Sequence, residues 1–360
     1  MNNQRSPYLF CEPFAGSAAL TYWLLGGKPP ISYMGGKSGY SSVIANILGL
    51  SQHHKPAGVI LGEPGPFAGV HATLGGASGS AEDVAGWAVS SWWSIGQIAG
   101  AGGFNTTLAY PSIWGDGIRQ PETASKIAQR FHTLPRAAEV ANIIRSWKDE
   151  EPRALWERLK ARGWPSLLLP EGCRGRWLGP QSVEEVAGFL VNTGWSYRGI
   201  SDGPFDPSRA IPNADLGRGA LTVEGVSDRC GDISFPSLAV WQGFAEDLPL
   251  PADLSGVICY CDPPYENTTG YKHGTCPRET VLRLARDWSG RGATVAISEA
   301  VRLDRELGEG WTSVDISHAR KGQARTFTKN QGTNRKEPQE WVTLNREPVH
   351  VPAKQVSLFG

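Results

Sequence analysis

The chain has 360 residues, in which 35 lysines and arginines balance 35 aspartates and glutamates. That length allows one large domain or two ordinary ones with a sizeable hydrophobic core. The balanced charge excludes a globally basic surface, so a nucleic-acid partner would need local basic patches. The six cysteines contain no C-x-x-C pair, which argues against a disulfide framework and a structural zinc and favours a reducing cytoplasm.

The N-terminal part of the chain alternates short strands with helices. The predicted elements are a strand over 8–11, a helix over 18–25, a helix from about 41 to 50 and a strand over 58–61. Gly26 and Gly27 end the first of these helices. Such alternation indicates βαβ units around a parallel sheet.

The character of the sequence changes between about residues 80 and 235. Helical patterns, separated by loops rich in Gly, Pro and Trp, are predicted over 121–133, 135–148, 152–162 and 181–192. Residues 84–104 carry no charge and could span a bilayer in length, but their serines and five glycines favour a buried helix and a glycine-rich loop. A structureless loop of roughly 150 residues is improbable, so this segment is expected to be an inserted domain.

The α/β alternation returns after residue 235. The predicted elements are a strand near 240, a strand over 256–261, a helix over 277–288, a strand over 293–297, and an antiparallel pair formed by 311–316 and 341–344. The expected fold is therefore α/β, with a Rossmann-like core whose mixed sheet closes in a C-terminal antiparallel hairpin. The core is assigned to 1–79 and 236–345, the mostly helical insertion to 80–235, and a flexible tail to 346–360.

The most informative residues are Asp262-Pro263-Pro264-Tyr265, which follow a short apolar run. A run of that length predicts a buried strand that stops abruptly. Each proline fixes φ and removes an amide donor, so nearby carbonyls remain free to accept hydrogen bonds. An acid, a fixed carbonyl and an aromatic ring are thus expected at the carboxyl end of a strand, where open α/β sheets bind ligands.

The turn Glu12-Pro13-Phe14-Ala15-Gly16-Ser17 joins the first strand to the first helix. Glycine lets a ligand approach the backbone, and the start of a helix offers free amide donors. Because the turn lacks G-x-G-x-x-G and contains a carboxylate, it suits a sulfonium or amine better than a pyrophosphate. An ordinary tight turn remains an alternative. Glu63 ends the second strand, where a ribose-binding acid lies in such folds, although a solvated turn residue is equally consistent.

Three segments together resemble the N6-adenine DNA methyltransferases of the DNA adenine methylase class, particularly members encoded by phages and mobile elements. They are the turn at 12–17, Tyr33-Met34-Gly35-Gly36-Lys37, and Cys261 with the Asp262–Tyr265 motif. The resemblance covers roughly 8–75 and 240–345 and leaves the insertion aside. It implies site-specific transfer of a methyl group from S-adenosylmethionine to the N6 atom of an adenine rotated out of duplex DNA.

The same resemblance assigns cofactor-binding residues. It places S-adenosylmethionine on Glu12, Pro13, Phe14, Ala15, Gly16, Ser17, Lys37 and Asp262, its ribose on Glu63, and its adenine on Glu246 or Asp247, with Glu246 preferred. The chain departs from the family pattern in two places. Ala18 stands where the family has a second glycine, and the Gly-Gly-Lys motif follows the first strand instead of preceding it.

The chemistry of adenine methylation agrees with the Asp262–Tyr265 motif. Asp262 and the Pro263 carbonyl can accept both amino hydrogens, which frees the conjugated lone pair of the nitrogen, while Tyr265 stacks on the extruded base. No metal and no covalent enzyme intermediate is needed. Direct transfer between the cofactor and the base requires the motif and the first turn to face one cavity. The alternatives are cytosine N4, where Ser is commoner than Asp262, adenine in RNA, or a catalytically silent DNA- or clamp-binding protein.

Contacts to DNA phosphates are expected from two basic segments, at 318–336 and 153–178. The predicted DNA-binding residues are Arg320, Lys321, Arg325, Lys329, Arg335 and Lys336, together with Thr268, Thr269 and Tyr271 in the loop after the motif. A charge run is often only a solvated face, so each segment has that second interpretation. The insertion at 80–235 is the natural candidate for target recognition.

The end of the chain suggests a separate partner. Gln355-Val356-Ser357-Leu358-Phe359 resembles the short peptide by which bacterial replication proteins bind the β sliding clamp. An extended segment with Leu358 and Phe359 as anchors beside Gln355 can fill a surface pocket at modest ordering cost. The alternative is an incidental hydrophobic tail.

Overall fold

The protein is described as a computed structural model. The described residues are 8–31, 36–77, 79, 135–200, 203–210, 222–231, 235, 238–250, 252–265, 276–319 and 339–350. The helix expected at 121–133, the uncharged stretch at 84–104 and the tail after residue 350 lie outside them. Within the described ranges, no helix combines the length and apolar character needed to cross a membrane.

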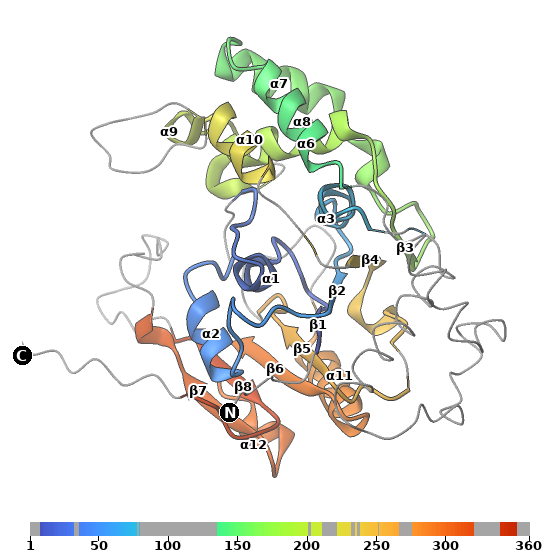
Figure 1. Cartoon of the computed structure of the whole chain (residues 1–360), viewed down its shortest axis with the longest axis vertical. Coiled ribbons are helices and arrows are strands. Elements are labelled where there is room, and N and C mark those ends of the chain that lie inside the picture. The colour runs from blue at the N-terminus through green and yellow to red at the C-terminus, as the bar shows by residue number, and fades with distance from the viewer. Residues whose placement is uncertain are drawn as a thin grey trace, which may run out of the picture.

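One mixed sheet of eight strands organises the described chain (Figure 1). In spatial order the strands are β3 (Gly175–Trp177), β4 (Leu238–Gly243), β2 (Gly58–Gly62), β1 (Leu9–Glu12), β5 (Val257–Cys261), β6 (Thr294–Glu299), β8 (Trp341–Leu344) and β7 (Thr312–Asp315). The strands from β4 to β6 are parallel, whereas β3, β8 and β7 pair with their neighbours in antiparallel fashion. The expected α/β fold with a mixed sheet and an antiparallel C-terminal hairpin is confirmed.

The central strands are buried along their whole length, because helices cover both faces of the sheet. Leu9 and Cys11 of β1 pack on the side of α11 (Arg278–Gly290), together with Cys259 of β5 and Val295 of β6. Phe10 of β1 points the opposite way, toward α1 (Ala19–Leu24) and α2 (Ser41–Ile47). This alternation explains why the strands read as continuous apolar runs, as is usual in parallel sheets.

A helical region lies at one end of the molecule, away from β7 and β8 (Figure 1). Its elements are α6 (Ala137–Ser146), α7 (Pro152–Arg162), η2 (Pro165–Leu167), α8 (Val183–Trp195), η3 (Tyr197–Gly199), α9 (Pro207–Ala210) and α10 (Val223–Gly231). Its apolar core includes Val70 and Leu74 of α3 (Phe67–Gly75). The helical region therefore packs on the core through α3, and its strand β3 joins the main sheet.

Most predicted elements are present within two or three residues of their expected ends, including α6, α7, α8 and α11. Elements that the sequence did not predict are β3, α3, α9, α10, α12 (Asp304–Leu307) and the short 3-10 turns. Strand β3 has only three residues, all half-buried. Helix α3 is buried at almost every position, so it lacks the amphipathic period that reveals a surface helix. Local pattern alone could not identify these two.

Candidate functional site

The acids singled out in the sequence gather along one edge of the sheet. Because β4, β2, β1 and β5 are adjacent and parallel, their carboxyl ends meet at this edge. Glu12 is the last residue of β1, Glu63 follows β2, and Asp262 follows β5. Glu246 and Asp247 lie in η5 (Ala245–Asp247), directly after β4. The fold thus collects acids that are far apart in the chain.

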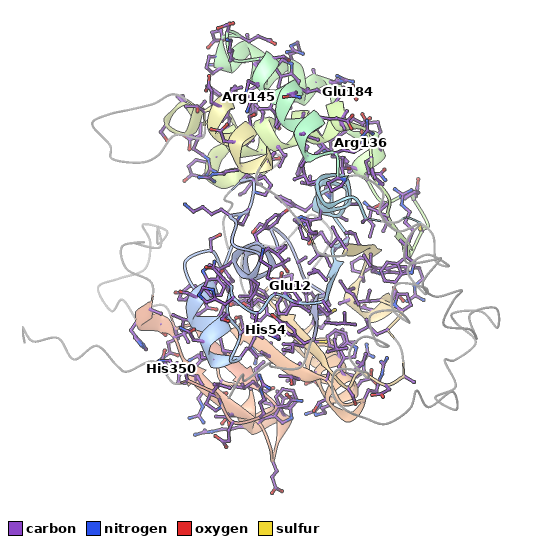
Figure 2. All side chains as sticks on the ribbon, in the orientation of Figure 1. Glu12, His54, Arg136, Arg145, Glu184 and His350 are labelled. Atoms are coloured by element: carbon purple, nitrogen blue, oxygen red, sulfur yellow. The ribbon has the colours of Figure 1, made fainter. Side chains whose placement is uncertain are left out.

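Strands β1 and β5 lie where the direction of the sheet order reverses. The chain runs from β1 outward through β2 to β4, then crosses to β5 and continues to β6 on the other side. Such a reversal leaves a crevice outside the carboxyl ends of the two central strands, and ligands of open α/β sheets bind there. Glu12 and Asp262 flank this position, and Figure 2 places Glu12 near the middle of the molecule.

The first turn is held tightly against β2. The Ala15 amide donates to the Gly62 carbonyl at 2.8 Å, and the Gly16 amide donates to a Glu63 carboxylate oxygen at 3.0 Å. Gly16 has φ of 47°, in the left-handed region that favours glycine. A Cβ atom on Gly62 would lie 3.0 Å from the Pro13 carbonyl oxygen, so the close approach favours glycine there.

Ala18 occupies the position at which the family pattern has a second glycine. Its backbone is left-handed, with φ of 51° and ψ of 43°, and it is the one non-glycine residue with positive φ among those described. Its carbonyl accepts the first bond of α1 from the Tyr22 amide at 2.9 Å. The chain thus retains a backbone conformation suited to glycine while carrying a side chain, at a cost of about 1–2 kcal/mol.

A small cavity joins the first turn to the acidic bend. Its empty volume of about 210 Å³ includes open solvent, and the centre of a water-sized sphere can occupy only about 10 Å³ of it. The lining residues are Glu12, Ala15, Ser17, Ala19, Gly36, Lys37, Tyr260 and Asp262. The turn and the bend therefore face one cavity, as the predicted site requires.

Asp262 is paired with a buried cation. The Lys37 Nζ atom lies 3.0 Å from a carboxylate oxygen of Asp262 and 3.3 Å from one of Glu340. Burial alone would lower the pKa of Lys37, but the two carboxylates offset it, so that pKa lies above its usual value. Burial raises the pKa of Asp262 to about 6, although Lys37 acts in the opposite direction. At neutral pH the pair is therefore charged on both sides.

Tyr265 lies against the same lysine. Its hydroxyl donates a short hydrogen bond to Glu340, and the Lys37 Nζ atom lies 4.5 Å from its ring centroid. Such an ammonium–ring contact is stabilising, more so when water is excluded. One lysine, two acids and one tyrosine thus form a single cluster at the carboxyl end of β5.

Glu12 is buried, and it forms no ion pair with a cation in the part of the chain that the structure describes. Its carboxylate accepts hydrogen bonds from the Thr21 amide at 3.0 Å and from the Thr21 hydroxyl. Burial raises its pKa to about 8, because these hydrogen bonds only partly compensate for lost hydration. A cation entering the cavity would favour the ionised form.

Glu63 and the acids after β4 lie beside the described cavity and are not among its lining residues. Both oxygens of Glu63 accept backbone amides, from Gly16 and from Gly65, each at 3.0 Å. Each carboxylate oxygen has a second lone pair that a ribose hydroxyl could use. Asp247 forms an ion pair with Arg174 at 2.8 Å, whereas the Glu246 side chain is exposed.

Several predicted site residues lie outside the described ranges. They are Tyr33, Met34, Gly35, Thr268, Thr269, Tyr271, Arg320, Lys321, Arg325, Lys329, Arg335, Lys336, Gln355, Leu358 and Phe359. The second basic segment, 153–178, lies within the described residues, and some of its arginines form ion pairs with acids. Arg153 pairs with Glu157 at 3.0 Å, and Arg158 pairs with Glu150 at 2.7 Å.

Two residues of this region were missed by sequence reasoning. Glu340 immediately precedes an apolar strand, but its role depends on the direction of that strand, which no local pattern reveals. His71 lies fully buried in α3, with Nε2 at 2.7 Å from the Gly16 carbonyl oxygen and Nδ1 at 3.1 Å from the Tyr22 hydroxyl. Burial lowers the pKa of His71 to about 4, so it supports the turn as a neutral ring.

A scan against models of known protein families finds no match for this chain, and a search of curated proteins finds no relative. In the part of the chain that the structure describes, no group of three or more His, Cys, Asp and Glu side chains could hold a metal ion.

Proposed function

We propose that the protein is a site-specific DNA methyltransferase that transfers a methyl group from S-adenosylmethionine to adenine N6. The observation that carries the proposal is the single cavity in which the first turn meets Asp262 at the reversal of the sheet. The resemblance of three sequence segments to the DNA adenine methylase class supports the same assignment. The antiparallel β7–β8 pair at the far edge supports a Rossmann-like methyltransferase core.

The cavity residues suit a positively charged cofactor. Glu12 and Asp262 supply carboxylates, Gly16 permits close approach to the backbone, and Glu63 and the acids after β4 continue the row toward positions for a ribose and an adenine. When bound, S-adenosylmethionine supplies an electrophilic methyl group on a sulfonium. Burial disfavours the ionised form of Glu12, which raises its pKa. A cation beside the carboxylate would offset that cost, whereas a phosphate would add to it, so the site favours a cationic ligand.

The residues of the bend can prepare an adenine amino group for attack. The Asp262 carboxylate is largely ionised at neutral pH, since its pKa is about 6, and it can accept one amino hydrogen. The Pro263 carbonyl oxygen has lone pairs that can accept the other. With both hydrogens held, the nitrogen lone pair leaves conjugation with the ring. The rate would then come from alignment of the two reactants.

Duplex DNA is the proposed substrate, and Tyr265 provides the surface on which an extruded base can stack. Stacking on an aromatic ring contributes about 1–3 kcal/mol per base, which offsets part of the cost of extrusion. We assign target recognition to the helical insertion and phosphate contacts to the basic segment at 318–336. The C-terminal pentapeptide is proposed to bind the β sliding clamp, and the protein to act in the cytoplasm.

Long-read sequencing of DNA from cells that express the protein tests this function directly. N6-methyladenine in one sequence context is expected, and Asp262→Ala should remove it while cofactor binding, measured by calorimetry, persists. N4-methylcytosine in the DNA would replace the proposed acceptor, and modified adenine only in RNA would replace the proposed nucleic acid. Unmodified nucleic acid together with DNA binding would favour a catalytically silent protein of the same fold.

Clamp binding is tested separately by a pull-down with purified β clamp. Deleting residues 355–360 should abolish capture and leave methylation of DNA in vitro unchanged. Equal capture by the truncated and full chains would eliminate this partner.

A further inference from the structure

Glu340 reaches the site because β8 runs opposite to its neighbours. Strand β8 is antiparallel to β6, and Trp341 at its start pairs with Glu299 at the end of β6. The residue before β8 therefore lies at the same edge as the carboxyl ends of β5 and β6. Its backbone is fixed there, since the Ile316 amide donates to the Glu340 carbonyl at 2.8 Å and the Glu340 amide donates to Ser317 of η6 (Ser317–Ala319) at 2.9 Å.

The Glu340 side chain is almost completely buried, with 1% of its surface exposed. A carboxylate removed from water is costly unless charges and donors replace the solvent. Here the Lys37 ammonium lies at 3.3 Å and the Tyr265 hydroxyl donates to the same oxygen. Glu340 therefore connects a residue of the Gly-Gly-Lys segment to the aromatic residue of the bend.

Lys37 competes for one of the acceptors that the proposed reaction can use. Its ammonium donates to one carboxylate oxygen of Asp262 at 3.0 Å, and an adenine amino group that approached the same oxygen would displace it. When adenine takes that acceptor, Lys37 must weaken its bond to Asp262. An unpartnered buried ammonium would be strongly unfavourable, but the second carboxylate, Glu340, already lies within reach.

We propose that Glu340 is a positioning residue of the reaction. It retains the Lys37 ammonium when Asp262 accepts the substrate amino group, and it orients the Tyr265 ring through the hydroxyl. This inference rests on the proposed methyltransferase function. It adds a residue that acts through Lys37 and Tyr265 and that need not touch the base.

The first test compares Glu340→Gln with wild type. Glutamine keeps the shape and an acceptor for Tyr265 but removes the charge that holds Lys37, so kcat should fall by about 10²-fold because alignment is lost. The dissociation constant for S-adenosylmethionine should change less than kcat does, by under about tenfold, since the first turn is untouched and only the Lys37 contact is altered. Glu299→Gln is the control for loss of a nearby negative charge, because its carboxylate bonds its own neighbour Ala300 while the charges of Lys37 and Glu340 act on its pKa through space. Its kcat should stay within about twofold of wild type.

The pH profile provides a readout that a merely structural role would not move. The titratable groups that face Asp262 are Lys37, Glu340, Tyr265, Glu12, Tyr260 and Cys261. The Glu340 charge raises the pKa of Asp262, and removing it also leaves Lys37 wholly to Asp262. Both changes lower that pKa in the ligand-free protein, so the acidic limb of kcat/KM should move to lower pH in Glu340→Gln.

A ligand-free measurement tests the cluster independently of activity. Thermal unfolding of Lys37→Met, Glu340→Gln and the double variant forms a cycle for the pair. Lys37→Met leaves Glu340 without its cation, and Glu340→Gln leaves Lys37 with Asp262 alone, so the double variant should lose less thermal stability than the sum of the single losses. If Glu340→Gln does not fold, Tyr265→Phe removes only the hydroxyl, and its kcat should fall while its ring remains.

The outcomes separate this inference from the proposed function. A wild-type protein that methylates nothing would reject the function itself. An active wild type in which Glu340→Gln behaves like Glu299→Gln, with an unmoved acidic limb and additive stability losses, would reject the role of Glu340 alone. A wild-type kcat in Tyr265→Phe would reject orientation through the hydroxyl.

Discussion

The sheet edge and the helical region contain ion pairs of similar length in very different surroundings. Lys37 and Asp262 lie 3.0 Å apart with 8% and 20% of their side chains exposed. Arg136 and Glu139 of α6 lie 2.7 Å apart with 36% and 55% exposed, and Figure 2 shows Arg136 on the helical region, far from Glu12. The shorter pair, Arg136 with Glu139, contributes less to folding stability, because water already solvates both of its charges.

The comparison indicates how each region is held together. At the sheet edge, the charged groups of Lys37, Asp262 and Glu340 are largely buried, and they are stabilised by one another and by hydrogen bonds. In the helical region, the charged residues are at the surface, and apolar side chains such as Val140, Ile144 and Leu155 fill the core. Changes of charge should therefore matter at the first site, and changes of volume at the second.

Removing the central cation should have the largest effect. Lys37→Met leaves Asp262 and Glu340 together without their partner, which should destabilise the protein by about 3–5 kcal/mol at neutral pH. The loss should be smaller at low pH, because Asp262 without Lys37 has a still higher pKa and is protonated there. Chemical denaturation at two pH values measures this. Arg136→Met is the surface control, and equal stability losses in the two variants would contradict the comparison.

The helical core should respond to volume. Ile144→Ala should lower the free energy of unfolding by about 2–5 kcal/mol, because a fully buried side chain is lost and a cavity remains. Its neighbour Arg145 pairs with Asp228 at the surface, and Arg145→Ala should leave the melting temperature almost unchanged. Thermal denaturation of the two variants measures the difference. A larger loss in Arg145→Ala would overturn the distinction between the regions.

Glu12 should couple cofactor binding to pH. Because its pKa is about 8, the Glu12 carboxyl is largely protonated at neutral pH in the ligand-free protein. If the cationic cofactor binds the ionised form, its affinity should rise by up to about tenfold per pH unit between roughly 6 and 8, with release of a proton. Titration calorimetry in buffers of different ionisation enthalpy detects that proton. Glu12→Gln should bind weakly and without this pH dependence.

The same residue predicts the pH dependence of stability without ligand. Because burial raises the pKa of Glu12 above its unfolded value, the folded state favours the neutral acid. Its contribution is fully present below about 4.5 and is lost as pH rises through about 8. Glu12→Gln should therefore raise the melting temperature more at pH 8.5 than at pH 5. A larger gain at the acidic pH would show that Glu12 is ionised in the folded protein.

Ala18 should give the smallest effect. Ala18→Gly relieves a left-handed backbone but increases the freedom of the unfolded chain, so the net gain should be at most about 1 kcal/mol. Ala18→Val should instead destabilise, since a β-branched side chain tolerates this conformation poorly. Melting temperatures of the two variants decide the matter, and a loss on Ala18→Gly would show that the methyl group packs favourably enough to outweigh the strain.

Local sequence signals were sufficient for much of the core. The apolar runs at 8–11, 58–61 and 256–261 predicted buried strands because parallel strands covered on both faces need apolar residues, and the strands lie at 9–12, 58–62 and 257–261. Glycines and prolines marked where these strands end, and acids at those ends were recognised as site candidates. The parallel arrangement of these strands then brings the candidates to one edge.

Other features had no local signal. Strand β3 has only three half-buried residues, too few to be recognised, and it joins the sheet by pairing with β4, where the Trp177 and Trp241 ring centroids lie 5.3 Å apart. Helix α3 is buried on all sides, so its sequence lacks the period of a surface helix. His71 in that helix supports the first turn 55 residues away in the chain.

The sequence by itself determined which strands are buried, where they end, and that Asp262 stands with two prolines and a tyrosine after one of them. Those properties depend on neighbouring residues, whose size, polarity and backbone freedom act locally. Only the tertiary structure decided that Glu340, 75 residues beyond Tyr265, meets Tyr265 and Lys37 in one cluster. The reversed direction of β8 brings them together, and strand direction is set by packing across the whole sheet.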